Sequence, residues 1–247
     1  MNTHDTIRRH RRGFLRAAAA TLAFCGLPWP AGAANPAAGK MRIGIIGSGR
    51  VGSALGTVWA KAGHEVMFSS LDLEHDRKLA AGVGPNARAG TPRQAAAFGD
   101  VLLISVPYGA LPQIGKDLAD LLKDKMVIDT CNPFPGRDGD IAVWAREKGA
   151  GLASAELLPG ARIVRTFNAV SYVRMAEAGQ SPGPRSGMPM AGDDAATIAT
   201  ASRLVRETGF EPVLIGPLAM GRHLMPGTPL AGERPPGDIR RIAATLQ

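Results

Sequence analysis

The fold of this 247-residue chain is decided by one stretch, Met41-Arg42-Ile43-Gly44-Ile45-Ile46-Gly47-Ser48-Gly49-Arg50-Val51-Gly52. Its first six residues form the short apolar run that is typical of a buried parallel strand. A helical pattern of apolar residues follows at once, and a second strand pattern begins at Glu65. Between them stand three glycines with the spacing G-x-G-x-x-G. The stretch therefore predicts a strand, a tight turn and a helix that leads to a second parallel strand.

Each glycine of this turn has a physical role. Gly47 makes the tight turn, Gly49 lets the backbone approach a pyrophosphate, and Gly52 lets the helix pack closely on the strand. The helix N-terminus offers free N–H groups and the positive end of its dipole to phosphates. Because strand, helix and strand flank the glycines, the motif predicts a dinucleotide site rather than a structural turn. The residues expected to bind there are Gly47, Ser48, Gly49, Arg50, Val51 and Gly52.

The alternation of strands and helices continues to Asn168, with one helix expected from Ala110 to Leu122. The sequence predicts an α/β fold, with a doubly wound, mostly parallel Rossmann sheet over residues 41–168. Residues 169–247 alternate in the same way, and predict a small C-terminal α/β subdomain. The strand patterns of the first part lie at 41–46, 65–68, 100–106, 125–129 and 162–167.

The end of the second strand decides which dinucleotide is expected. An acid there would accept hydrogen bonds from the adenosine ribose and repel a 2′-phosphate. This chain has Ser69 and Ser70 instead, and the first acid is Asp72. We therefore expect both serines to contact the cofactor and NADP to be preferred, with NAD as the alternative. The cations that are candidates for a 2′-phosphate are Arg50, Arg77, Lys78 and Arg93.

Residues 1–33 have the pattern of a secretory leader. Five arginines and one acid precede an apolar run from Ala17 to Leu27, and a small-residue cleavage pattern ends at Ala33. Arg11-Arg12 and the Phe-Leu pair that follows resemble the twin-arginine signal, which exports folded proteins. We expect the protein in the periplasm, with residues 34–40 as a flexible lead-in to the fold.

Charge and composition exclude several classes of function. The formal charge is +8, but the leader carries +4 of it, and the remaining +4 includes no dense basic run. Nucleic acid is therefore not an expected partner. No segment after the leader is long and apolar enough for a permanent membrane span, and no group of ligands has metal spacing.

Catalytic side chains are scarce in the rest of the chain. His64 and His75 are expected to be structural or solvated, which leaves His223 as a weak candidate for a proton donor. Cys131 is expected to pack in the core, because no histidine is placed by the sequence to activate it. Reducing a ketone or imine needs a placed proton donor, whereas a flavin-like ring disperses the incoming charge. The scarcity therefore favours a flavin-type acceptor.

An ordered set of motifs resembles the NADPH:deazaflavin oxidoreductases, the coenzyme F420-dependent NADP oxidoreductase family, which is related to the nucleotide domain of the six-transmembrane metalloreductases. The resemblance extends from Met41 to Leu230. Its motifs are Gly47-Ser48-Gly49-Arg50-Val51-Gly52, Val106-Pro107-Tyr108, Asp129-Thr130-Cys131-Asn132-Pro133, Thr166-Phe167-Asn168-Ala169, Ala191-Gly192-Asp193-Asp194 and Gly216-Pro217-Leu218.

The resemblance implies hydride transfer between NADP(H) and F420, FMN or FAD, without an obligatory catalytic side chain. It implies that the C-terminal subdomain covers the acceptor cleft and that Leu218 lines this cleft. The family commonly has an arginine at the position of Ser70, so this chain departs from it there. The further residues implied to bind the cofactor are Ser69, Val106, Pro107, Tyr108, Asn132, Asn168 and Ala169.

Two other functions remain open at this stage. One is the reduction of a small carbonyl or imine substrate, with His223 or Tyr108 as the acid. The other is an NADP(H)-binding module without turnover, which serves a membrane partner. A homodimer is a further possibility, ordered by the Pro-, Gly- and Arg-rich tail at 227–241.

Overall fold

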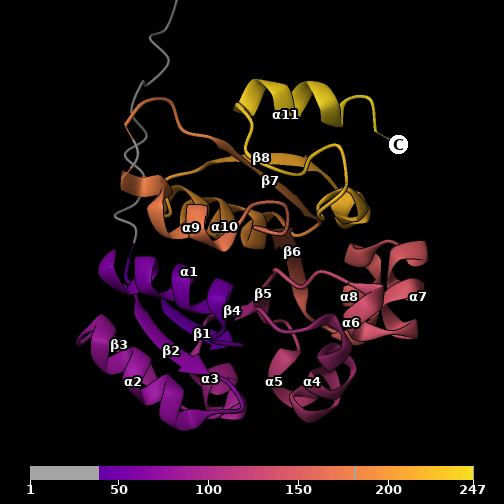
Figure 1. Cartoon of the computed structure of the whole chain (residues 1–247). Coiled ribbons are helices and arrows are strands. Elements are labelled where there is room, and N and C mark those ends of the chain that lie inside the picture. The colour runs from indigo at the N-terminus through magenta and orange to yellow at the C-terminus, as the bar shows by residue number, and fades with distance from the viewer. Residues whose placement is uncertain (1–38, 181, 247) are drawn as a thin grey trace, which may run out of the picture. The chain divides into compact units, whose positions relative to one another are not determined.

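The computed structural model of the chain describes residues 39–180 and 182–246 (Figure 1). Their strands form one eight-stranded sheet in the order β3-β2-β1-β4-β5-β6-β7-β8. All neighbours are parallel except β6 and β7, which run antiparallel. The strands are β1 (Arg42–Ile46), β2 (Glu65–Ser69), β3 (Ala87–Ala89), β4 (Val101–Ile104), β5 (Met126–Asp129), β6 (Arg162–Thr166), β7 (Gly187–Gly192) and β8 (Glu211–Gly216).

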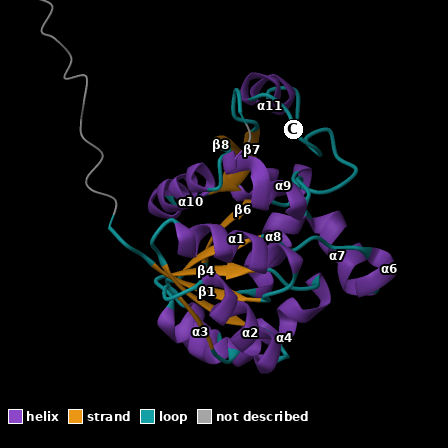
Figure 2. Cartoon of the chain, turned by 60° about the vertical axis from the view of Figure 1, so that its left-hand side comes forward, coloured by secondary structure: helices purple, strands orange, loops and turns teal. Residues whose placement is uncertain are grey.

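Helices cover both faces of this sheet, as Figure 2 shows for α1 and α10 on one side and α3 and α4 on the other. The α-helices are α1 (Arg50–Lys61), α2 (Leu73–Val83), α3 (Pro92–Phe98), α4 (Leu111–Asp117), α5 (Ala119–Leu122), α6 (Pro135–Asp138), α7 (Asp140–Lys148), α8 (Ala150–Leu157), α9 (Tyr172–Glu177), α10 (Ala195–Glu207) and α11 (Pro236–Ala243). The 3₁₀ helices are η1 (Tyr108–Ala110), η2 (Ala178–Gln180) and η3 (Leu218–His223).

The predicted fold class is confirmed, since the sheet is mostly parallel and doubly wound with helices on both faces. The boundary expected at residue 168 falls just after β6, and the chain beyond it adds β7 and β8 to the same sheet. The segment from residue 169 onward is thus built onto the nucleotide half by strand pairing. The expected leader at 1–33 lies outside the described residues, as does most of the lead-in at 34–40.

The two largest apolar clusters of the described residues lie on the two faces of the sheet. On one face, Trp59 of α1 is completely buried and donates from Nε1 to the carbonyl oxygen of Leu204 in α10, at 3.0 Å. Its ring also meets the edge of Phe167 just after β6, with centroids 6.2 Å apart. These contacts fix α1, which follows the glycine turn, against the second half of the sheet.

The helix expected from Ala110 to Leu122 is interrupted. The structure has η1, α4 and α5 there, with a break at Leu118, whose φ and ψ are −116° and 14°. The carbonyl of Asp117 accepts a hydrogen bond from Nη1 of Arg93 in α3, at 3.0 Å. In a continuous helix that carbonyl would accept a hydrogen bond from an N–H group of the next turn. At the break it accepts instead from the side chain of Arg93.

Across residues 39–180 and 182–246, no helix combines the length and apolar character that crossing a bilayer requires.

Candidate nucleotide-binding site

The three glycines of the turn divide into two that the fold requires and one that faces open space. A Cβ on Gly47 would lie 2.2 Å from the carbonyl oxygen of Ser105, and its φ is +99°. A Cβ on Gly52 would lie 2.0 Å from the carbonyl oxygen of Gly47. A Cβ on Gly49 would meet no described protein atom within 4 Å. The fold itself therefore gives no reason for a glycine at 49, and the approach of a ligand does.

The backbone amides of the turn divide in a similar way. Those of Gly47 and Ser48 both donate to the carbonyl oxygen of Ser69, at 2.9 and 3.0 Å, and so attach the turn to the end of β2. The helix α1 starts next, with Gly49 as its N-cap, and no side chain of the described residues caps it. Its first turn has no acidic residue either. The N–H groups of this turn are thus available to an anion.

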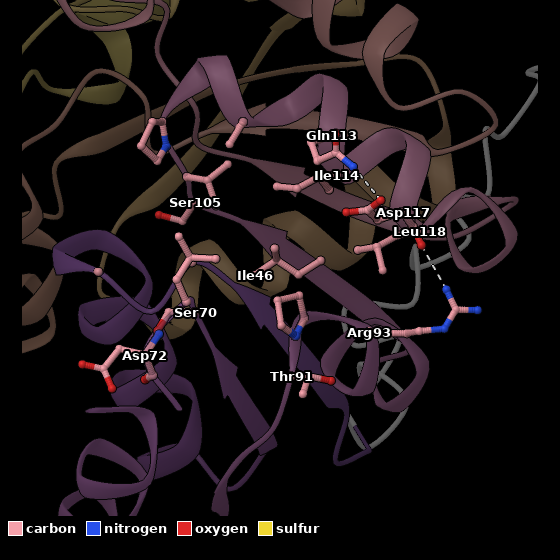
Figure 3. Close-up of a pocket in the computed structure, with 17 residues that line it drawn as sticks. Ile46, Ser70, Asp72, Thr91, Arg93, Ser105, Gln113, Ile114, Asp117 and Leu118 are labelled. Atoms are coloured by element: carbon pink, nitrogen blue, oxygen red, sulfur yellow. Dashed lines mark hydrogen bonds between the residues drawn. The ribbon is translucent and has the colours of Figure 1, made fainter. Parts of the chain in front are cut away.

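A cavity of about 740 Å³ opens in front of the turn, at the carboxyl ends of β1, β2 and β4 (Figure 3). Five of the predicted site residues line it: Gly47, Gly49, Ser70, Val106 and Pro107. Its other walls come from Ile46, Leu71, Asp72, Thr91, Pro92, Arg93, Ser105, Ala110, Gln113, Ile114, Asp117 and Leu118. A pocket of this size and mostly apolar lining, with amides at one end, suits a nucleotide.

The serines at the end of β2 have different environments. Ser69 is completely buried and donates to the carbonyl oxygen of Ile45, at 2.6 Å, so its hydroxyl does not reach the cavity. Ser70 lines the cavity and donates to Oδ2 of Asp76, at 2.9 Å. Ser48, which is also buried, donates to the other oxygen of the same carboxylate.

Sequence reasoning missed Asp76. This carboxylate is 0 % exposed and joins the glycine turn to the loop after β2. One signal was available, because Asp76 stands four residues before Ala80, the other buried residue of α2, and so lies on the apolar stripe of that helix. A charged residue on a buried stripe requires polar partners, and here they are two serines of the site.

Of the four candidate cations, Arg93 lines the cavity, whereas Arg50, Arg77 and Lys78 do not. Arg93 is in an ion pair with Asp120 and also donates to the Asp117 carbonyl. Arg50 lies over the ring of Tyr172, 5.5 Å from its centroid. Arg77 is paired with Glu74 on the exposed face of α2.

The predicted residues that follow β5 and β6 form a second cluster, which does not line the cavity. Nδ2 of Asn132 donates to the carbonyl oxygen of Asn168, at 2.8 Å, and its Oδ1 accepts from Arg165, at 3.4 Å. Asn168 is 4 % exposed, yet neither its Oδ1 nor its Nδ2 has a hydrogen-bond partner among the described residues. Phe167, just before it, has a φ of +66°, which is unusual for a bulky residue. A buried, unpartnered amide beside such a backbone is the kind of group that a ligand satisfies.

The remaining predicted residues serve the interior or lie outside the cavity lining. Tyr108 is buried and its hydroxyl contacts the carbonyl of Ala150, at 3.1 Å; burial raises the pKa of this phenol well above its usual range. Burial likewise raises the pKa of the Cys131 thiol, in line with a packing role. Leu218 is buried, and His223 at the end of η3 does not line the cavity. Val51 is half-buried in α1, and the carbonyl of the buried Ala169 accepts from the amide of Gly232, at 2.8 Å.

The sheet order, the glycine turn and the cavity define a Rossmann-fold protein with a turn of the dinucleotide-binding kind. Residues 42–133 match the family model described as NADP oxidoreductase coenzyme F420-dependent. The chain is therefore similar to this family over part of its nucleotide-binding half.

Two curated proteins are similar in sequence to this chain. The chain is 31% identical over 152 residues to an F420-dependent NADP reductase of Methanothermobacter thermautotrophicus, a match that covers 56% of this chain and 65% of that protein. It is 28% identical over 187 residues to the metalloreductase STEAP3 of Rattus norvegicus, covering 74% of this chain and 35% of that one. The chain thus spans less than two thirds of either relative.

Solved structures show the same fold. A hypothetical protein of Sinorhizobium meliloti has a TM-score of 0.67 at 24% identity, with 78% of this chain and 93% of that one covered. A structure described as a putative F420-dependent NADP reductase of Arthrobacter sp. has a TM-score of 0.62 at 21% identity, covering 74% and 87%.

Proposed function

We propose that this protein transfers hydride between NADP(H) and a flavin-type acceptor, namely F420, FMN or FAD. The observation that carries the proposal is the open space at Gly49, beside the uncapped first turn of α1 and at one end of the cavity. The family match and the names of the relatives support NADP and F420 as the reactant classes.

In this proposal the cofactor lies along the carboxyl edge of the sheet. The amides at the start of α1 hold the pyrophosphate, because Gly49 leaves the space that a phosphate oxygen needs. The apolar wall of Ile46, Pro92 and Leu118 packs against the adenine.

The nicotinamide end lies toward Val106, Pro107 and Asn168. Asn168 offers one buried donor and one buried acceptor without partners, which is the set that a carboxamide complements. Arg165 and Asn132 hold the loop of Asn168 in place. A bound nicotinamide would supply hydride to a planar ring held at van der Waals distance, with the accompanying proton drawn from solvent. The protein contributes orientation, so no side-chain acid is needed.

The test is a direct assay of the purified full-length protein. NADPH is mixed with F420, FMN or FAD in turn, and the loss of nicotinamide absorbance is followed. We expect oxidation of NADPH with at least one acceptor, and none with the Gly49→Val variant. Oxidation of NADPH by a small carbonyl or imine compound alone would replace this proposal with that second reductase function.

A binding module without turnover is the second candidate function. It is favoured by the cavity lining, which among the described residues includes no histidine, tyrosine or cysteine. Tight binding of NADPH, measured by calorimetry, with no acceptor reduced in the same assay would establish this function instead.

We also propose that the protein is exported folded to the periplasm, on the basis of the Arg11-Arg12 motif and the apolar run after it. Cell fractionation and the mass of the mature N-terminus test this. We expect cleavage after Ala33. Loss of export is expected when Arg11 and Arg12 are both changed to Lys, and unchanged export of that variant would contradict a twin-arginine signal.

A further inference from the structure

The buried carboxylate of Asp76 holds two serine hydroxyls, one on the glycine turn and one on the loop after β2. It accepts from Oγ of Ser48 and, at 2.9 Å, from Oγ of Ser70. Asp76 itself has no exposed surface, so it reaches a ligand only through these serines. Of the two, Ser70 lines the cavity.

The Ser70 hydroxyl has one proton, and it already donates this proton to an acceptor within the protein. Its possible acceptors are the Asp76 carboxylate and the carbonyl of Asp72, at 3.2 Å, and both belong to the protein. Its oxygen also accepts from the amide of Asp72, at 3.1 Å. What remains toward the cavity is a lone pair, which can accept from a ribose hydroxyl. A phosphate is an acceptor as well, so Ser70 in this state cannot donate to it.

The charged side chains that line the cavity agree with that chemistry. Two carboxylates, Asp72 and Asp117, line the cavity, and the lining cation Arg93 has both terminal nitrogens on Asp120. The described lining thus has no cation that is free to bind a 2′-phosphate without first leaving an acidic partner.

We propose that Asp76 sets the selectivity between the two nicotinamide dinucleotides. By keeping Ser70 as an acceptor, it suits the ribose subsite to a free 2′-hydroxyl, and the protein binds NADH within about tenfold of NADPH. The inference rests on the proposed cofactor site and deepens it, because it names the groups that distinguish a ribose 2′-hydroxyl from a 2′-phosphate.

The test measures dissociation constants for NADH and NADPH by calorimetry, on wild type and two variants. Asp76→Asn keeps the shape but presents an amide N–H₂ to one serine, whose own proton is then released toward the ligand. We expect the preference for NADPH over NADH to rise about tenfold in this variant. Asp72→Asn is the matched control, since it removes a charge at the same end and keeps a good N-cap for α2. Its preference should change about threefold at most.

Each outcome decides one question. A wild type that binds NADPH more than about a hundredfold tighter than NADH overturns the inference, even if Asp76→Asn does not fold. An equal change of the NADPH preference in Asp76→Asn and Asp72→Asn overturns the inference too. The loss of one negative charge would then explain the change in both variants. Binding of neither nucleotide would instead refute the proposed site.

Discussion

Nη1 of Arg165 lies 2.5 Å from Oδ2 of Asp129, and both side chains are completely buried. The two residues are register partners on the adjacent parallel strands β5 and β6. Nη1 also donates to the carbonyl of Cys131, at 3.0 Å, and Nη2 reaches Asn132. The pair therefore links the sheet to the loops that are proposed to hold the nicotinamide.

Removing one partner of this pair should be strongly destabilising. Asp129→Leu leaves the guanidinium buried without its counter-ion, and we expect the free energy of unfolding to fall by about 3–5 kcal/mol in urea denaturation. The double variant Asp129→Leu/Arg165→Met, which removes both charges, should regain most of that loss. A single variant within about 1 kcal/mol of wild type would show that the pair does not stabilise the fold.

Two glycines of the turn should respond differently to substitution. Gly49→Val should fold with wild-type stability and lose NADPH binding, because its side chain projects only into the ligand space. Gly47→Ala should be destabilised by about 2 kcal/mol or more, from its positive φ and the clash with Ser105. Thermal unfolding and calorimetric titration separate the two effects. Unchanged NADPH affinity in Gly49→Val would refute the pyrophosphate position.

A cation introduced at the ribose end should change cofactor preference. Ser70→Arg places a guanidinium at the cavity lining, where it can pair with a 2′-phosphate. We expect NADPH affinity to rise about tenfold relative to NADH, as measured by titration of both nucleotides. Thr91→Arg, at another point of the lining, is a position control. A shift of Ser70→Arg toward NADH would contradict the assigned 2′ subsite.

The contact between the buried His64 and the partly buried Glu207 should make stability depend on pH. Nδ1 of His64 accepts from the amide of Met41, and Nε2 lies 2.7 Å from Oε2 of Glu207. Burial raises the pKa of Glu207, but the hydrogen bond from His64 and the charge of Arg203 outweigh it, so the pKa lies below the ordinary 4.5. A lowered pKa means that the stabilisation is present above pH 4.5 and is lost as pH falls through the folded-state pKa.

Glu207→Gln should therefore be about 1 kcal/mol less stable than wild type at pH 7. The difference should disappear in unfolding measurements at acidic pH, once the wild-type carboxylate is protonated. Glu211→Gln is the control, since that residue only approaches an exposed arginine at 4.0 Å. A deficit in Glu207→Gln that stays constant with pH would exclude the carboxylate charge as its cause.

Local signals predicted the first half of the fold well. The apolar run before Gly47 specifies its strand within a few residues, and β1 is present at Arg42–Ile46. The three-residue β3 and the helix α8 were not predicted. β3 is too short to have a period, and α8 is too evenly apolar to show an amphipathic stripe.

The candidate site was predictable only where backbone chemistry decides it. Gly47 and Gly49 are placed at the cavity by the turn itself, whereas Ser69 turns inward because alternate residues of a strand face opposite sides. Asp76 joins the site through a helix that packs back on the turn, a tertiary contact between residues 28 positions apart. Single-sequence patterns do not encode such contacts.

The antiparallel pairing of β6 with β7 has a mechanical consequence. In this pairing the register partners are Val164 with Gly192, Arg165 with Ala191 and Thr166 with Met190. Main-chain hydrogen bonds between these residues therefore join β7 and β8 to the rest of the sheet. Moving β7 away from β6 would break these main-chain hydrogen bonds. We therefore expect β7 and β8 to keep their position relative to β6 when a ligand binds.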